Sequence, residues 1–202
     1  DRYICSKRDD KLKKEQETEN IKTIEHEEGH EFNGIMRNLT NDTGGNIHDN
    51  GTIEITSNSI RYSDEHPKNL VDYQNNNSHY HSADEQGNAL ICFDFKDKSI
   101  NLSSYTIMSN GNSTGKNSYN LKSWVIEVSN DGNQWKEIDR HENDSTLNGN
   151  RIVHNFQVQQ QNNEFTRFIR LRQTGDSWSP PNYKRIWFYF IEFYGKIKYP
   201  SK

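Results

Sequence analysis

Apolar and polar residues alternate through much of the chain, which is the pattern of half-buried β-strands. In SWVIEVSNDGNQWKEID, residues 123–139, valine and isoleucine alternate with polar residues until residues 130–133 interrupt them. These four residues, Asn-Asp-Gly-Asn, tolerate positive φ angles and are typical of a turn, so the stretch predicts a hairpin. Trp135 follows the turn, and we expect it to cap one end of the core. This stretch therefore builds the fold and carries no candidate chemistry.

Further segments with the same alternation predict an all-β fold. Loops rich in Asn, Ser, Gly and Asp separate them, and no long helical period intervenes, which argues against a βαβ fold. Two packed antiparallel sheets satisfy such a pattern, so we predict a two-sheet antiparallel β-sandwich of the jelly-roll type. The predicted strands cover residues 52–57, 89–95, 103–109, 123–139 (a pair), 151–158, 165–174 and 187–195.

The beginning of the chain has a different character. Residues 1–30 are highly charged, and KRDDKLKKEQETENIKTIEHEEGHE, residues 7–31, offers only three apolar anchors: Leu12, Ile21 and Ile24. Three such residues are too few for a stripe that faces a core. We therefore expect a charged, partly helical linker, with a partner-binding helix as the alternative interpretation.

A short helix is predicted next. In EFNGIMRNLT, residues 31–40, apolar residues recur at helical spacing, so this segment should pack onto the domain that follows. The Gly-Gly pair at Gly44 and Gly45 then breaks the pattern. We accordingly divide the chain into a linker (1–30), a β-sandwich (31–197) and a tail (198–202).

The composition and net charge of the chain argue against some classes of function. Apolar residues make up only 30% of the chain and the mean hydropathy is −1.15, but aromatic and β-branched residues concentrate from about Thr52 onward, where a core can form. The net charge of −4 gives no basic field to hold nucleic acid. No apolar run is long enough to cross a bilayer. The two cysteines, Cys5 and Cys92, are fewer than a small secreted β domain usually carries, which favours a cytoplasmic location.

Several segments together resemble the F5/8 type C (discoidin-like, galactose-binding-like) domain family. EVSNDGNQWKEI resembles the signature hairpin of the family, and ALICFDFKDKSI resembles its strand that ends in an acidic and an apolar residue. YTIMSNGN, RFIRLRQTG and FIEFYGKI resemble the next strand and loop, the penultimate strand with paired arginines, and the closing strand. The likeness spans residues 31–197 and is greatest to an intracellular branch often joined to BTB-type modules. It implies a galactose-binding-domain-like sandwich.

Two departures from the family pattern bear on what the resemblance implies. Secreted members join the two ends of the domain by a disulfide, and Cys5 and Cys92 do not occupy those ends. The acidic calcium cluster of the first loop is replaced by NLVDYQNNNSHYHS, in which Asp72 is the only carboxylate. Together with Glu192 of the closing strand and backbone carbonyls, Asp72 could still hold a Ca²⁺ ion. We expect no other cofactor.

No motif predicts catalysis. The chain has no Gly-x-Ser-x-Gly turn and no cysteine in a reactive context. HEEGHE, residues 26–31, spaces two histidines as a zinc helix does, but Gly29 weakens the helix and no third ligand is evident, so a charged linker is favoured. His79 and His81 have strand spacing and could form a metal pair, although a ligand-contacting loop or simple packing is favoured. We expect no enzymatic activity.

The resemblance places three ligand-facing loops, residues 72–82, 110–120 and 174–185, at one end of the sandwich. Their Asn and His side chains supply donors and acceptors, and their Tyr and Trp side chains supply flat apolar faces. A hydroxyl-rich ligand needs that combination, but a protein–protein hot spot has the same composition. Trp178, which precedes two prolines, is either a ligand platform or a plug over the sandwich end. The candidate ligand-binding residues are His79, Tyr80, His81, Asn110, Asn112, Lys116, Asn117, Tyr119 and Trp178.

These observations predict a non-catalytic recognition module with two open interpretations. The first is an intracellular adaptor or scaffold that docks a protein partner or larger assembly through these loops, which the cysteine usage and the charged linker favour. The alternative is lectin-like binding of a carbohydrate or another small polar ligand. Phospholipid binding is disfavoured, because the three loops are too polar.

Overall fold

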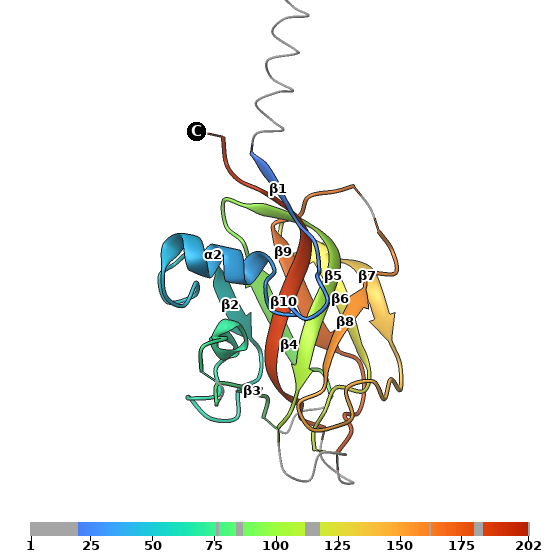
Figure 1. The fold of residues 1–202 in the computed structure, drawn as a ribbon. Helices are drawn as coiled ribbons and strands as arrows, with labels where there is room; N and C mark the ends of the chain where they lie inside the picture. Colours follow the sequence, from blue (N-terminus) through green and yellow to red (C-terminus); the bar gives the residue numbers. More distant parts are fainter. Residues whose placement is uncertain are drawn as a thin grey trace, which may run out of the picture.

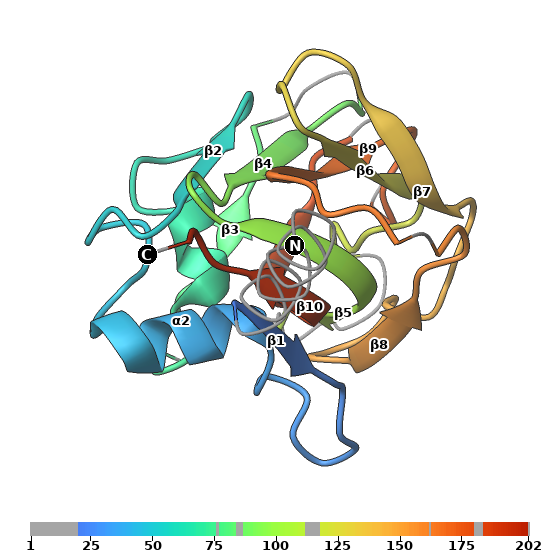
Figure 2. The same cartoon turned by 90° about the horizontal axis from the view of Figure 1, so that it is seen from above.

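Two antiparallel sheets of five strands each form the molecule (Figure 1). The computed structural model describes residues 20–75, 77–83, 87–111, 118–161, 163–179 and 184–201. Sheet A contains β1 (Ile21–Ile24), β3 (Tyr80–His81), β5 (Ser99–Ser109), β8 (Val153–Gln157) and β10 (Trp187–Lys198). Sheet B contains, in spatial order, β2 (Glu54–Ser57), β4 (Leu90–Asp94), β9 (Phe168–Gln173), β6 (Trp124–Ser129) and β7 (Lys136–His141). Figure 2 looks along the strands and separates the two layers.

The predicted β-sandwich is confirmed, and each predicted strand is present. The strand alternation places the core between the sheets: in β9, for example, Ile169 and Leu171 are buried, whereas Arg170 between them lies on the outer face. The hairpin turn is confirmed too. Gly132 has φ of 72°, and the Asp131 carboxylate accepts the backbone N–H groups of Asn133 and Gln134, each at 2.8 Å.

The short helix is also confirmed, as α2 (Ile35–Thr43), and β10 determines where it begins. The N-cap residue Gly34 has no side chain to bond the first amides, and Glu192 of β10 takes that role. Its carboxylate accepts the N–H groups of Met36 at 2.8 Å and Arg37 at 3.0 Å. A Cβ on Gly34 would overlap the carbonyl oxygen of Phe193, so only glycine allows the helix to approach β10 this closely.

Two short strands were not predicted. β1 lies within the segment expected to be a charged linker, and it pairs with β10 through residues such as Ile21 and Lys198. β3 pairs with the beginning of β10. A further short helix, the 3₁₀ helix η1 (Pro67–Val71), precedes β3. None of the helices in the described residues has both the length and the apolar character needed to pass through a membrane.

A chain of hydrogen bonds connects the two sheets inside the core. The Tyr105 hydroxyl of β5 donates to the Asp139 carboxylate of β7 at 2.6 Å, and the Trp124 indole N–H donates to the same hydroxyl at 2.9 Å. His141 lies 3.0 Å from Asp139 through Nε2 and 2.8 Å from Asp144 through Nδ1. Its ring stacks on that of Trp124, with centroids 4.4 Å apart. Because Asp139 is fully buried, these bonds satisfy a charge that would otherwise be costly.

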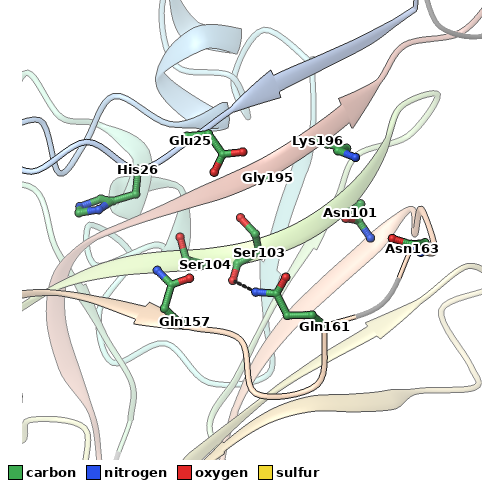
Figure 3. Close-up of a pocket in the computed structure, with 10 residues that line it drawn as sticks. All are labelled: Glu25, His26, Asn101, Ser103, Ser104, Gln157, Gln161, Asn163, Gly195 and Lys196. Atoms are coloured by element: carbon green, nitrogen blue, oxygen red, sulfur yellow. Dashed lines mark hydrogen bonds between the residues drawn. The ribbon is translucent and has the colours of Figure 1, made fainter.

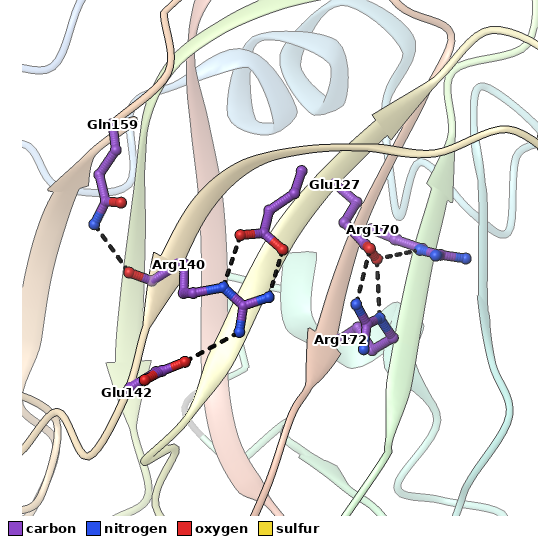
Figure 4. A network of polar contacts seen from close by, with 7 residues as sticks. Glu127, Arg140, Glu142, Gln159, Arg170 and Arg172 are labelled. Carbon is purple, nitrogen blue, oxygen red and sulfur yellow. Dashed lines mark hydrogen bonds and ion pairs between the residues drawn. The ribbon is translucent and has the colours of Figure 1, made fainter.

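A second polar network covers the outer face of sheet B (Figure 4). Glu127 of β6 accepts bonds from the guanidinium groups of Arg170 at 2.6 Å and Arg172 at 2.9 Å. The prediction that Trp135 caps the core is wrong. Trp135 lies half-buried on this outer face, with the Arg170 guanidinium 3.9 Å from its ring centre and the Phe168 ring beside it.

Candidate functional site

The three predicted loops meet at one end of the sandwich, as the resemblance implies. The His81 and Tyr119 rings lie 5.6 Å apart, and the Tyr119 carbonyl accepts the N–H of Trp187 at 2.8 Å. Trp178 joins the group through its backbone N–H, which donates to the Asn120 carbonyl at 2.9 Å. We call the side chains around His81 the loop-end site: Arg61, Tyr62, Glu65, His79, His81, Tyr119, Arg185 and Trp187.

The pairing of β3 with β10 positions the centre of this site. His81 and Trp187 are cross-strand partners, so their side chains emerge on the same face of the sheet. Their rings stack with centroids 4.9 Å apart and an angle of only 7° between the planes. Their strand neighbours, Tyr80 before His81 and Phe188 after Trp187, form the adjacent cross-strand pair and point into the core on the opposite face.

Charged groups surround the His81 ring. Arg61 Nη1 lies 3.5 Å from His81 Nδ1, and the Arg61 backbone N–H donates to the His81 carbonyl at 3.0 Å. Glu65 Oε1 lies 3.4 Å from His81 Nδ1 and also 3.4 Å from His79 Nε2. Glu65 is itself largely buried, so it is an acceptor held inside the site and shared by the two histidines.

His81 is an uncharged imidazole at neutral pH. Burial, followed by the nearby positive charges of Arg61 and Arg185, lowers its pKa from 6.5 to about 3. The short distance to Glu65 is therefore no ion pair at neutral pH, because the imidazole carries no charge. The tautomer depends on which neighbour bonds Nδ1, because Arg61 can only donate to an unprotonated Nδ1, whereas a Glu65 carboxylate can only accept from a protonated one. His81 Nε2 is an N–H donor in the first case and an acceptor in the second.

Three buried polar atoms of the site have no hydrogen-bond partner within the described residues: His81 Nε2, Glu65 Oε2 and Trp187 Nε1. Leaving such an atom without a partner costs roughly 1–3 kcal/mol. Trp187 Nε1 is a donor, an ionised Glu65 Oε2 is an acceptor, and His81 Nε2 is one or the other according to its tautomer. The three residues are neighbours, because His81 contacts both Glu65 and Trp187. The site thus holds donor and acceptor capacity that no bond within the described residues uses.

An exposed aromatic ring stands at the margin of the site. Tyr62 is 56% exposed, the largest exposed fraction among the large apolar side chains in the described part of the chain. The Arg61 guanidinium lies 4.7 Å from the centre of its ring. Since Arg61 also contacts His81, the Tyr62 ring is a flat apolar surface next to the buried polar groups.

The structure moves two predicted ligand residues into the core. Tyr80 is fully buried, and its hydroxyl lies 2.8 Å from Ser57 Oγ and 2.7 Å from the Ser59 carbonyl. Asn110 is also fully buried and donates to the Ser118 carbonyl at 2.6 Å. Both side chains shape the loops from beneath and do not line a ligand surface.

Trp178 differs from both roles expected of it. Its indole N–H donates to the Asp144 carbonyl at 2.8 Å, and the Lys122 ammonium lies 4.7 Å from the ring centre. The half-buried ring is thus fixed to the neighbouring loop and partly covered by a cation, so it is neither an open platform nor a core plug. The predicted residues Asn112, Lys116 and Asn117 lie outside the described residues.

The two residues proposed for a calcium ion have other contacts. Both carboxylate oxygens of Glu192 accept backbone N–H groups, which come from Met36, Arg37 and Phe193. Since N–H groups repel a cation, Glu192 does not fit as a calcium ligand. Asp72 Oδ2 lies 3.2 Å from Ser78 Oγ, and the described residues contain no cluster of three or more His, Cys, Asp or Glu side chains suited to a metal. A calcium ion bound by Asp72 and loop carbonyls remains a prediction.

Sequence reasoning missed Arg61, Glu65 and Trp187, and it included Arg185 in the third loop without naming it as a candidate ligand residue. Arg61 and Glu65 lie in a loop before η1 that was assigned no role, and Trp187 was assigned only to the closing strand. The signal for Trp187 was its position at the start of that strand, directly after the third predicted loop. Its pairing with His81 depends on β3, which has only two residues and too short a pattern to predict.

Comparison with known proteins agrees with this architecture. The family model named F5/8 type C domain matches residues 54–186, so the chain belongs to the F5/8 type C domain family. Domains of this class are non-catalytic binding modules. None of the curated proteins that were compared matches the chain.

Similar solved structures are carbohydrate-binding modules of Clostridium perfringens. One, CBM32-3 from a family 31 glycoside hydrolase, has a TM-score of 0.57 and 21% identity, and the alignment covers 72% of this chain and 92% of that one. CpGH89CBM32-5, in complex with GalNAc-β-1,3-galactose, has a TM-score of 0.55 and 14% identity, covering 71% and 96%. The family 32 module of NanJ, in complex with galactose, has a TM-score of 0.53 and 9% identity, covering 73% and 95%. At these identities the likeness shows the fold alone.

Proposed function

We propose that the loop-end site binds carbohydrate. The observation that carries the proposal is the set of three buried polar atoms on His81, Glu65 and Trp187 that lack partners in the described residues. A sugar hydroxyl both donates and accepts, so adjacent hydroxyls would satisfy this set, while the sugar's C–H face would lie on the Tyr62 ring. Two of the similar structures hold galactose or GalNAc-β-1,3-galactose, which supports this ligand class.

Titration calorimetry with galactose and with GalNAc-β-1,3-galactose tests the proposal. Tyr62→Ala and His79→Ala remove contacts at the site without opening the core, because neither side chain is fully buried. Each should weaken binding about tenfold, the loss expected for one stacking or hydrogen-bonding group. His154→Ala is the matched control, since His154 is an exposed histidine on β8. Equal affinity of all variants, or no binding of either sugar, would refute the assignment.

The uncharged state of His81 adds a test by pH. Because its pKa is lowered to about 3, His81 does not change charge between pH 5 and pH 8. The affinity contributed by His81 should therefore stay constant over that interval. A loss of binding near pH 6.5 that follows the titration of His81 in NMR spectra would contradict the buried geometry.

An intracellular adaptor is the second candidate, in which the same surface docks a protein partner. The half-exposed Tyr62 beside Arg61 supports it, because an aromatic with an arginine neighbour is also typical of interface hot spots. The carbohydrate and adaptor proposals are distinguished by immobilising the chain and measuring which proteins it retains from a cell lysate. Under the carbohydrate proposal, free sugar releases what is bound. Under the adaptor proposal, sugar has no effect and Tyr62→Ala abolishes retention.

A further inference from the structure

A separate polar groove lies on sheet A, away from the loop-end site (Figure 3). Its volume is about 490 Å³, within the range of small-ligand sites. We call it the sheet A groove. Its lining residues come from the segment after β1, from β5, β8 and β10, and from the segment after β8: Glu25, His26, Asn101, Ser103, Ser104, Gln157, Gln161, Asn163, Gly195 and Lys196.

The groove exists because neighbouring strands carry small residues at the same level. Ser103 and Ser104 of β5 and Gly195 of β10 form its floor. A Cβ on Gly195 would overlap the carbonyl oxygen of Asn101, and the register of the β5–β10 pair shifts at this residue. Such a bulge distorts the strand locally, and Gly195 adds no side chain to the groove above Ser103 and Ser104.

Protein contacts hold the amide side chains of the wall in place. Gln161 Nε2 donates to the Ser103 carbonyl at 3.1 Å, which Figure 3 shows as a dashed line. Gln157 Nε2 donates to Asn155 Oδ1 at 2.9 Å. Each glutamine thereby uses its NH₂ group on the protein and keeps its carbonyl oxygen as an acceptor for a ligand.

The charges of the lining balance. Glu25 and Lys196 are both exposed and carry opposite charges, and the other lining side chains are amides, hydroxyls and one imidazole. Such a wall favours no anion or cation, and it has too little apolar surface for a lipid or an apolar peptide. Its oriented acceptors instead require a ligand rich in hydroxyl donors.

We propose that the sheet A groove is a second binding site, for a neutral polyhydroxylated ligand of one or two sugar rings. The Gln157 and Gln161 carbonyls would accept its hydroxyls, and the Ser103 hydroxyl and the Lys196 ammonium would donate to it. The site stands on its own observations and does not depend on the loop-end proposal. Trp187 begins β10 and Gly195 lies near its end, eight residues further on, so the two sites are about 26 Å apart.

The test is NMR titration of the full chain with lactose, cellobiose, maltose and chitobiose. Wild type is compared with the double variant Gln157→Ala/Gln161→Ala, whose two exposed side chains can be removed without opening the core. Gln134→Ala, an exposed glutamine in the β6–β7 turn, is the matched control. His79→Ala reports on the loop-end site alone. Titration extends to about 50 mM, because single-ring sites often have millimolar affinity.

The expected result is a saturable shift of the backbone amide signals of Ser103, Ser104 and Gly195, which line the groove and are present in every variant, with at least one of the four sugars. Affinity at these signals should fall at least fivefold in the double variant and remain unchanged in the Gln134 and His79 variants. No shift at the groove with any sugar would overturn the proposal. Groove shifts that disappear with His79→Ala but persist in the double variant would also overturn it, because they would report binding at the other end of β10.

Discussion

Replacing Asp139 by asparagine tests whether the hydrogen bonds between the sheets stabilise the sandwich. Asp139 Oδ2 accepts from Tyr105 at 2.6 Å and lies 3.0 Å from His141 Nε2, while Oδ1 accepts the backbone N–H of Gln159 at 3.3 Å. Asparagine has one acceptor oxygen and one NH₂ group. In either orientation of the amide, the NH₂ group faces at least one donor.

The size of the stability loss expected for Asp139→Asn follows from the burial of this side chain. The Asp139 side chain has no solvent exposure, so water cannot satisfy the donor that loses its acceptor. One such donor costs roughly 1–3 kcal/mol, and the remaining bonds lose their charge-assisted part, so Asp139→Asn should lower the free energy of unfolding by about 2–4 kcal/mol. That is a large share of the roughly 5–15 kcal/mol that stabilises a typical domain.

The same variant should change the pH dependence of stability. Burial lowers the pKa of His141, but its hydrogen bonds to Asp139 and Asp144 outweigh burial and hold that pKa above 6.5. A raised pKa means that the folded state binds the proton more tightly than the unfolded state. The contribution of His141 to the free energy of unfolding is therefore fully present below pH 6.5, and it is lost as the pH rises through the pKa of His141 in the folded state. In Asp139→Asn this fall in stability should be smaller.

Urea denaturation followed by tryptophan fluorescence, at several pH values from 5.5 to 8.5, measures both effects. Asp97→Asn is the control, because the Asp97 side chain is 59% exposed and pairs only with its neighbour Lys98 among the described residues. If Asp139→Asn lies within about 0.5 kcal/mol of the Asp97 control, the range typical of surface substitutions, the reasoning about this network is wrong.

Three further predictions concern other parts of the fold. Gly34→Ala should lower the free energy of unfolding by about 2 kcal/mol or more in urea denaturation, since its Cβ meets the backbone of β10, and a fully stable variant would disprove the close approach. Burial raises the pKa of Cys92 from 9.0 to about 11, so iodoacetamide should alkylate it about 100-fold more slowly at pH 8 than the same thiol in the unfolded chain. Glu127→Gln should destabilise the chain by about 1–2 kcal/mol in thermal unfolding, because Arg170 and Arg172 lose their shared carboxylate and solvent only partly replaces it; a variant as stable as wild type would contradict this.

The sequence predicted the sheets well because their signal is local. Alternation such as that of residues 168–173 determines which side chains face the core, and the turn chemistry around Gly132 marks where the chain reverses. The short helix was predicted from its spacing, but its beginning depends on Glu192, which lies more than 150 residues away in the chain. No local pattern contains that contact.

The candidate site was predicted less completely. The described parts of the three loops lie near one another around His81, and their contact with a ligand stays a prediction, whereas Tyr80 is a core residue. In a two-residue strand, alternation cannot distinguish the inward residue from the outward one, because a shift by one position exchanges them. Glu65 and Trp187 could not be connected to His81 before the pairing of β3 with β10 was known.

The pairing of β1 with β10 determines how the module can be attached to other chains. The Tyr199 N–H donates to the Asn20 carbonyl at 2.9 Å, so the described chain enters and leaves side by side at one end of the sandwich (Figure 1). A domain with adjacent entry and exit points can be spliced into a surface loop of a host protein with little strain. In such a graft the loop-end site would face outward from the host, and the sheet A groove would lie near the junction, where a neighbouring domain could shield it.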